Sequence, residues 1–157
     1  MGIFDMKWLF SEFIFLSLLV CSNAKAHEGF DLQCRLDNDE VMMLSHSRDT
    51  VYISFESLEH SSDTDGRIIK LDILSGEAKQ SLVNNRMGEF SYVLRGIGED
   101  IEGAIAIVYE KNEGVHNAYF SVTNYLGREV EVYVCDPTTL KVDKNLLILA
   151  INNVPFL

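Results

Sequence analysis

The sequence predicts an all-β domain, a small antiparallel β-barrel or sandwich of about eight strands, preceded by a cleaved signal peptide. Three observations lead to this prediction. Short segments alternate apolar and polar residues with a period of two, and clusters of Gly, Asn and Asp separate them. No segment carries the apolar stripe of a strong amphipathic helix. Two cysteines, Cys34 and Cys135, remain after the signal and are expected to form one disulfide.

The N-terminal segment 1–26 has the organisation of an export signal. A short start precedes an apolar run from Phe13 to Cys21, and Ala24-Lys25-Ala26 then supplies the small-x-small pattern of a cleavage site. The run is well short of the roughly 20 residues that a spanning helix needs. Residues 27–157 are therefore expected to form a single periplasmic or secreted domain. An uncleaved segment that anchors the protein in the inner membrane is the alternative.

The first half of this domain is predicted to contain strands at 30–36, 51–55 and 67–74, where apolar residues alternate with polar ones. A short strand is also predicted at 41–44, where Met42 and Met43 are adjacent and break the alternation. In the strand at 30–36, Cys34 shares its face with the apolar residues, which places it toward the core. The segment 59–66 is a polar loop.

The segment 75–88 has no clear apolar pattern. A short helix around 77–84 and a loop are equally good interpretations of it.

A four-strand meander is predicted from Glu89 to Cys135, with glycines marking its turns. Its second strand, 101–109, is apolar on both faces, which is typical of a central strand covered on both sides. Lys111–Gly114 has the composition of a hairpin turn. An apolar run at 146–151 is expected to add a last strand or a short helix.

In the last strand of the meander, the valines and the disulfide cysteine are predicted to lie on opposite faces. Val130, Val132 and Val134 alternate with Glu129, Glu131 and Tyr133, so the valines are expected to face the core. Cys135 then falls on the opposite face. Either a β-bulge near Tyr133 restores the phase, or the disulfide lies at the rim of the domain.

The residues give little sign of catalytic or metal chemistry. No nucleophile motif is present, and nothing in the spacing of the carboxylates singles out an acid/base pair, so we expect neither an enzyme nor a cofactor. Asp63-Thr64-Asp65-Gly66 has half the pattern of a calcium loop but is better explained as an acidic hairpin tip. His27, at the new N-terminus, could bind copper if His116 lay nearby.

The net charge of −11 limits the choice of partners. Such a chain repels the phosphates of nucleic acids and the headgroups of anionic membranes. It attracts basic proteins and steers them toward itself. We therefore expect the partner to be another protein, basic or membrane-anchored, with neither nucleic-acid binding nor direct membrane binding after signal cleavage.

Tyrosines and carboxylates of the meander are predicted to form the partner-binding surface, because interfaces favour exposed tyrosine. The alternative is that these tyrosines occupy ordinary half-buried sheet positions. The loops 95–102 and 59–66 are the candidates for insertion into a partner. The predicted partner-binding residues are Tyr92, Arg95, Glu99, Asp100, Tyr119, Glu129, Glu131 and Tyr133.

Three functions fit this plan. The signal peptide, single disulfide and acidic all-β domain resemble small exported bacterial proteins that bind another protein, such as periplasmic lysozyme inhibitors and toxin-immunity proteins. The resemblance is one of plan and assigns no site residues. The first hypothesis is an inhibitor or immunity-type domain that neutralises a basic cell-wall hydrolase or toxin. The second is a periplasmic accessory subunit that tunes a membrane-bound sensor or transcriptional regulator, with a small apolar ligand in the barrel. The third is a surface or fimbrial component.

Overall fold

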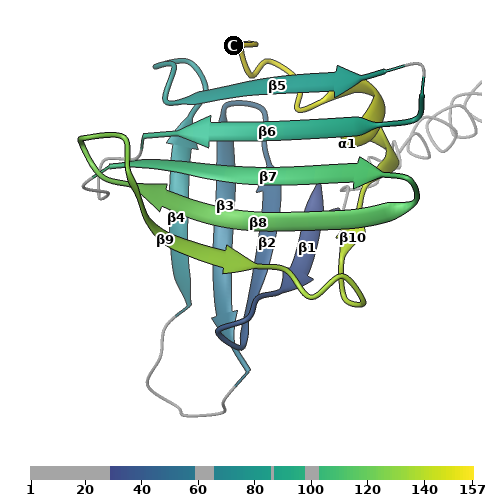
Figure 1. The fold of residues 1–157 in the computed structure, drawn as a ribbon. Helices are drawn as coiled ribbons and strands as arrows, with labels where there is room; N and C mark the ends of the chain where they lie inside the picture. Colours follow the sequence, from purple (N-terminus) through teal and green to yellow (C-terminus); the bar gives the residue numbers. More distant parts are fainter. Residues whose placement is uncertain (1–28, 59–65, 86, 98–102) are drawn as a thin grey trace, which may run out of the picture.

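The computed structural model describes residues 29–58, 66–85, 87–97 and 103–157 as two five-stranded antiparallel sheets and one short helix. The sheets lie face to face, and their strands cross rather than run alongside each other (Figure 1). The first sheet has the order β10-β1-β2-β3-β4 and the second the order β5-β6-β7-β8-β9. The elements are β1 (Leu32–Arg35), β2 (Glu40–His46), β3 (Thr50–Ser57), β4 (Arg67–Asp72), β5 (Ala78–Asn84), β6 (Phe90–Gly96), β7 (Ala104–Asn112), β8 (Val115–Thr123), β9 (Glu129–Val134), β10 (Lys141–Val142) and α1 (Lys144–Leu149).

The core fills the space between the sheets, because every second residue of the main strands points inward. An edge-to-face contact of Phe55 and Phe120, with ring centroids 4.9 Å apart, joins β3 to β8 across this space. The all-β prediction is confirmed, with ten strands in place of about eight. The largest fully buried side chains are Tyr92, Tyr109, Phe55, Phe120, Leu32, Leu36, Met42, Leu44, Ile53, Leu71, Leu94 and Ile107.

The predicted disulfide is confirmed and lies where the two sheets meet. Cys34 of β1 and Cys135, just after β9, are bonded with their Cα atoms 5.6 Å apart, and both are buried. Backbone pairing of Leu36 with Cys135 continues the contact between β1 and β9. The amide of Asp37 also donates to the carbonyl of Val134 at 3.0 Å. The covalent bond therefore stabilises a corner that the backbone already closes.

The interpretation of 75–88 as helix or loop is wrong, because residues 78–84 form β5 at the edge of the second sheet. Ala78 and Gln80 point into the core while Lys79 is exposed, so the strand has the expected period of two. The inward residue at the middle of the strand is a polar one, and this hid the pattern. The apolar run near the C-terminus forms the helix α1, which was one of the two structures expected there.

The buried side chain of Gln80 holds the C-terminal segment. Its amide nitrogen donates to the carbonyl oxygens of Ile151 at 2.8 Å and Val154 at 2.9 Å. Its amide oxygen accepts from the backbone N–H of Ile151 at 2.9 Å and from the hydroxyl of Tyr92 at 3.3 Å. Phe156 then pairs in parallel with Gln80, so the end of the chain covers this edge of the second sheet.

The expectation that the valines of β9 face the core is also wrong. Val130, Val132 and Val134 are 57%, 45% and 49% exposed, whereas Cys135 is buried. Tyr133 lies on the inner face with Cys135 and stacks on Phe120, with ring centroids 6.4 Å apart. The disulfide therefore needs no bulge near Tyr133, and it belongs to the core rather than to the rim.

Candidate functional site

The candidate site is a hollow on the outer face of the second sheet. Strand register places Arg95, Ala106, Ser121 and Val132 side by side across β6, β7, β8 and β9. The next row contains Val93, Val108, Tyr119 and Val134. In Figure 1 this face is turned toward the viewer, and no other labelled element lies over it.

The hollow exists because its floor is built from small side chains. Ala106 and Ser121 lie side by side in the floor, and Ala104 continues it at the start of β7, while longer side chains stand around them. The resulting space is open to solvent and has a volume of about 650 Å³. Its lining residues are Val93, Arg95, Ala104, Ile105, Ala106, Val108, Glu110, Tyr119, Ser121, Thr123, Gly127 and Glu129.

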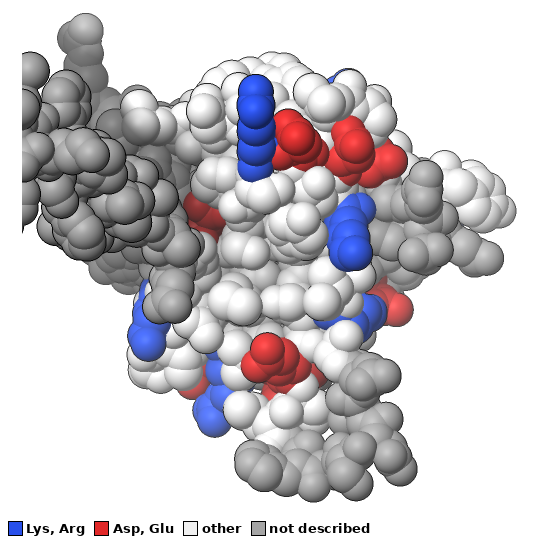
Figure 2. Space-filling view, turned by 180° about the vertical axis from the view of Figure 1, so that it is seen from behind, with Lys and Arg blue, Asp and Glu red and all other residues white. Residues whose placement is uncertain are grey.

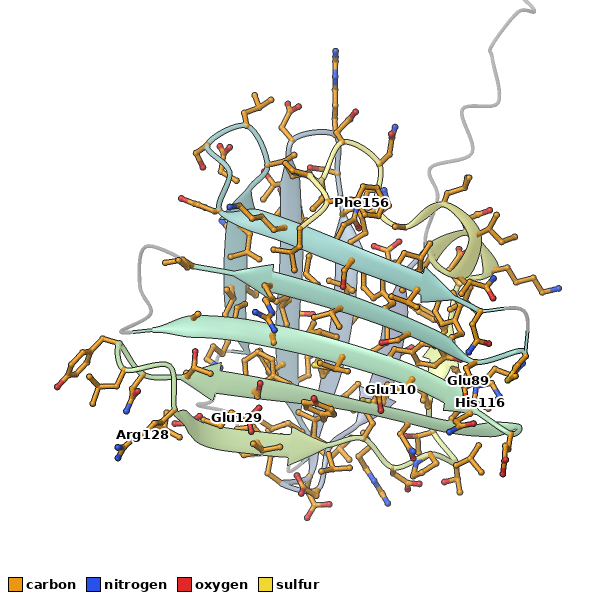
Figure 3. The ribbon with its side chains drawn as sticks, turned by 45° about the horizontal axis from the view of Figure 1, so that its top comes forward. Glu89, Glu110, His116, Arg128, Glu129 and Phe156 are labelled. Atoms are coloured by element: carbon orange, nitrogen blue, oxygen red, sulfur yellow. A yellow bond between two sulfur atoms is a disulfide. The ribbon has the colours of Figure 1, made fainter. Side chains whose placement is uncertain are left out.

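Charged groups surround Tyr119 in this hollow. Burial raises the pKa of the Tyr119 phenol, the carboxylates of Glu110 and Glu129 raise this pKa further, and the guanidinium of Arg95 lowers it. Figure 3 shows Glu129 at the start of β9, and Glu110 farther along the face, on the side toward His116. The hollow thus has a carboxylate toward each end and a tyrosine between them.

A β-bulge directs Glu129 into the hollow. Val122 pairs with Glu131, but the next residue of β8, Thr123, pairs with Glu129, so β9 carries one extra residue at Val130. Such an insertion reverses the side to which the following side chains point. Glu129 consequently shares the outer face with Thr123, whereas Glu131 shares the inner face with Tyr133.

Glu131 and Tyr133 lie at the rim of the space between the sheets. The Tyr133 hydroxyl donates to Glu131 at 3.3 Å. Burial is the largest cause that raises the pKa of the Tyr133 phenol, and the carboxylate of Glu131 raises it further. On the facing sheet the guanidinium of Arg67 lies 4.3 Å from the centroid of the Phe55 ring, a cation–π contact. This rim cluster is separated from the hollow by the thickness of β9.

The structure therefore divides the predicted partner-binding residues. It brings Arg95, Tyr119 and Glu129 together in the hollow. The expectation of an exposed Tyr92 is wrong, because this side chain is fully buried and bonded to Gln80. Tyr109, another tyrosine of the meander, is buried as well.

Several expectations fall on residues outside those that the structure describes. They concern Glu99 and Asp100, the signal segment 1–26, His27, and most of the loops 59–66 and 95–102.

Sequence reasoning missed Glu110 and Ser121. Glu110 follows Val108 and Tyr109, and the whole strand was interpreted as apolar on both faces. The signal that could have found the hollow is the spacing of Ala104 and Ala106, two small residues on one face of a strand that is otherwise large and branched. Small side chains in the middle of an exposed sheet face leave room for something else to pack there.

Within the hollow the Thr123 hydroxyl donates to the carbonyl oxygen of Ala104 at 3.1 Å, whereas the two histidine pairs of the described residues lie away from it. His46 Nδ1 lies 2.7 Å from Asp31 Oδ2, and His116 Nδ1 lies 2.7 Å from the Tyr109 hydroxyl. Within the described segments no three His, Cys, Asp or Glu side chains are grouped as a metal site would require. No helix in these segments is long and apolar enough to cross a membrane.

The two outer faces of the domain differ in character. Figure 2, seen from behind, shows the face of the first sheet with uncharged atoms over much of its middle and charged side chains mostly toward its margins. The register places Met43, Ser54 and Ile68 side by side on this face. The grouping of carboxylates around a half-buried tyrosine, Tyr119, belongs to the second sheet.

No protein family matches the chain, and neither a curated protein nor a solved structure is significantly similar to it. The class is therefore defined by the structure alone: a disulfide-bonded domain of two antiparallel sheets with a carboxylate-flanked hollow on one outer face. The buried disulfide is compatible with an exported protein, because such bonds persist in oxidising compartments.

Proposed function

We propose that this protein is an exported binding domain that neutralises a basic protein partner, such as a cell-wall hydrolase or a toxin. The observation that carries the proposal is the hollow itself. Glu110 and Glu129 stand at an open, tyrosine-bearing hollow in a chain whose net charge is −11. The overall charge would steer a basic protein toward the domain, and the hollow would give it a place to dock.

The exposed valines of β9 enlarge the surface available to such a partner. Val132 lies next to Ser121 in the row that crosses the hollow, and Val134 lies next to Tyr119. A stable interface buries about 800 Å² on each partner, with an apolar centre and a polar rim. The hollow together with the valine edge supports an interface of this kind.

The accessory-subunit hypothesis makes use of the same face, with a membrane-anchored regulator as the partner. The structural hypothesis uses an edge strand of a sheet. On β9 the outward backbone groups of Val134 are already occupied by Asp37, whose amide and carboxylate both bond to that residue. This contact shortens the β9 edge, although β4 is a further edge strand. We prefer the inhibitor-type function because the structural hypothesis makes no use of the hollow.

Capture from the compartment of export tests the proposal. The disulfide-bonded protein is immobilised at about 50 mM salt, and retained proteins are identified by mass spectrometry. We expect a basic hydrolase or toxin whose activity falls when the domain is bound. Binding should weaken as salt is raised toward about 300 mM, because exposed charges are screened. A partner that is acidic, or one whose binding ignores salt, contradicts the proposal, and a single-pass regulator favours the accessory subunit.

A further inference from the structure

The hollow contains polar groups that the domain itself does not use. Among the residues that the structure describes, the side chains of Arg95, Glu110, Ser121 and Glu129 make no hydrogen bond or ion pair with one another or with any other described group. The same holds for the hydroxyl of Tyr119. Ser121 is only 2% exposed, and it forms part of the floor.

The Ser121 hydroxyl is available to a ligand that enters the hollow. Among the described residues no side-chain oxygen or nitrogen is both buried and without a partner, so this hydroxyl is reached from the open side of the hollow. Ser121 is surrounded by Ala106 on β7 and Val132 on β9, neither of which offers a side-chain partner. The direction left to its hydroxyl is the hollow.

We propose that the hollow binds an extended basic segment of the partner protein, with a cationic side chain at each glutamate and the main chain over Ala106 and Ser121. This inference rests on the proposed function, since it names the part of the basic partner that is recognised. The Ser121 hydroxyl then bonds a main-chain group of the segment. Arg95 donates to one of its carbonyl oxygens.

The length of the hollow favours a segment rather than one side chain. From Glu110 to Ala104 the chain of β7 advances six residues, or about 20 Å at 3.3 Å per residue. Glu129 lies beyond Thr123, the pairing partner of Ala104. One guanidinium cannot contact carboxylates that far apart. An extended peptide with two basic residues separated by three or four positions spans most of this length, and its long side chains cover the rest.

Arginine fits the two ends better than lysine does. Its planar guanidinium presents five donors, so it can bind a carboxylate in bidentate fashion and also stack on an aromatic ring. The ring of Tyr119 lies near enough to both glutamates for their charges to act on its hydroxyl. A cation bound between the glutamates and Tyr119 could stack on this ring, which the ammonium group of lysine does less well than a guanidinium.

The test uses short synthetic peptides and the disulfide-bonded protein. The probe is Ac-Arg-Gly-Ser-Gly-Arg-NH2, and the controls are the same peptide with glutamine at both ends and a trimer of N-acetylglucosamine. Binding is followed by titration calorimetry and by the amide NMR shifts of Ser121 and Tyr119. We expect the diarginine peptide to bind and to shift these amides, and the glutamine peptide to bind at least tenfold more weakly.

Matched variants separate the hollow from general charge attraction. Glu110→Gln and Glu129→Gln should each weaken the diarginine peptide by about two- to fivefold, the usual worth of an exposed ion pair. Glu56→Gln makes the same charge change on the other sheet and should leave binding unchanged. Ala106→Val narrows the floor without changing charge and should abolish the shifts at Ser121.

The inference is overturned if the glutamine peptide or the sugar trimer binds as well as the diarginine peptide, or if Glu56→Gln weakens binding as much as the other two. Its failure is distinguishable from that of the proposed function. If a basic partner is captured but binds equally to Glu110→Gln and Glu129→Gln, the hollow is not its site. If the peptide binds and no basic partner is captured, the site stands and the inhibitor function does not.

Discussion

Replacing Gln80 with leucine should detach the C-terminal segment from the second sheet. Leucine has nearly the same size as glutamine, so the change removes hydrogen bonds without opening a large cavity. Four partner groups are left without their bonds: the N–H and the carbonyl of Ile151, the carbonyl of Val154, and the hydroxyl of Tyr92. Gln80 and these residues are all buried, so water does not replace the lost bonds freely.

The expected destabilisation follows from these four groups. A buried hydrogen bond contributes about 1–1.5 kcal/mol, which gives roughly 4–6 kcal/mol for the set. Burying an apolar side chain in place of a polar one returns about 1 kcal/mol. The free energy of unfolding should therefore fall by about 3–5 kcal/mol. Tyr92→Phe, which removes only the 3.3 Å bond, should cost about 1 kcal/mol.

Urea unfolding, followed by far-ultraviolet circular dichroism with the disulfide intact, measures these differences. Hydrogen exchange at the Ile151 amide should accelerate in the Gln80→Leu variant before the rest of the core is affected. Lys79→Leu is the control, because Lys79 neighbours Gln80 on β5 but points to solvent. If Gln80→Leu unfolds within about 1 kcal/mol of the unmodified protein, the C-terminal segment does not depend on this side chain.

Three further outcomes can be checked in the same way. The hydrogen bond to Asp31 outweighs desolvation and raises the pKa of His46 above its ordinary 6.5. The stabilisation from this pair is therefore complete below about pH 6.5 and is lost as the pH rises through the raised value, and His46→Gln should flatten the pH profile of unfolding above pH 6. Removing the disulfide by a double cysteine-to-alanine change should cost about 4 kcal/mol, and an unchanged urea midpoint would show that it adds nothing. Gly96→Ala should destabilise by about 1–3 kcal/mol, because the added Cβ would lie 2.4 Å from a methyl carbon of Leu71, and an unaltered midpoint would mean that Leu71 moves freely.

The sheet architecture could be predicted because it depends on patterns that are local in sequence. Alternation at 30–36 and 51–55 identifies strands whichever partner they later meet. The hairpin at Lys111–Gly114 was predictable for the same reason, since Glu113 and Gly114 both adopt positive φ in a two-residue turn. The disulfide followed from counting cysteines.

The orientation of β9 could not be predicted, because two alternating sets of residues were both plausible as the core face. Valine is more apolar than glutamate, and this favoured Val130, Val132 and Val134. In the structure Tyr133 and Cys135 face inward and the valines outward, because Cys135 bonds to Cys34 where the two sheets meet. The hollow could not be predicted either. It depends on the bulge that turns the Glu129 side chain to the outer face, and on small residues of two strands lying side by side.

The position of the disulfide has a consequence for how fast the domain folds. β1 pairs with β10, so Gln33 lies opposite Lys141. The strands β2 to β9, which make up most of both sheets, lie between these two strands in the sequence. Contacts between residues so far apart slow folding, because the chain loses loop entropy before the contact repays it. Cys34 and Cys135 are separated by 101 positions and close nearly the same loop. The oxidised chain begins with these ends already joined, so it should refold faster than the reduced chain. The ratio of the two refolding rates then reports whether β1 pairs with β10 before or after the rate-limiting step of folding.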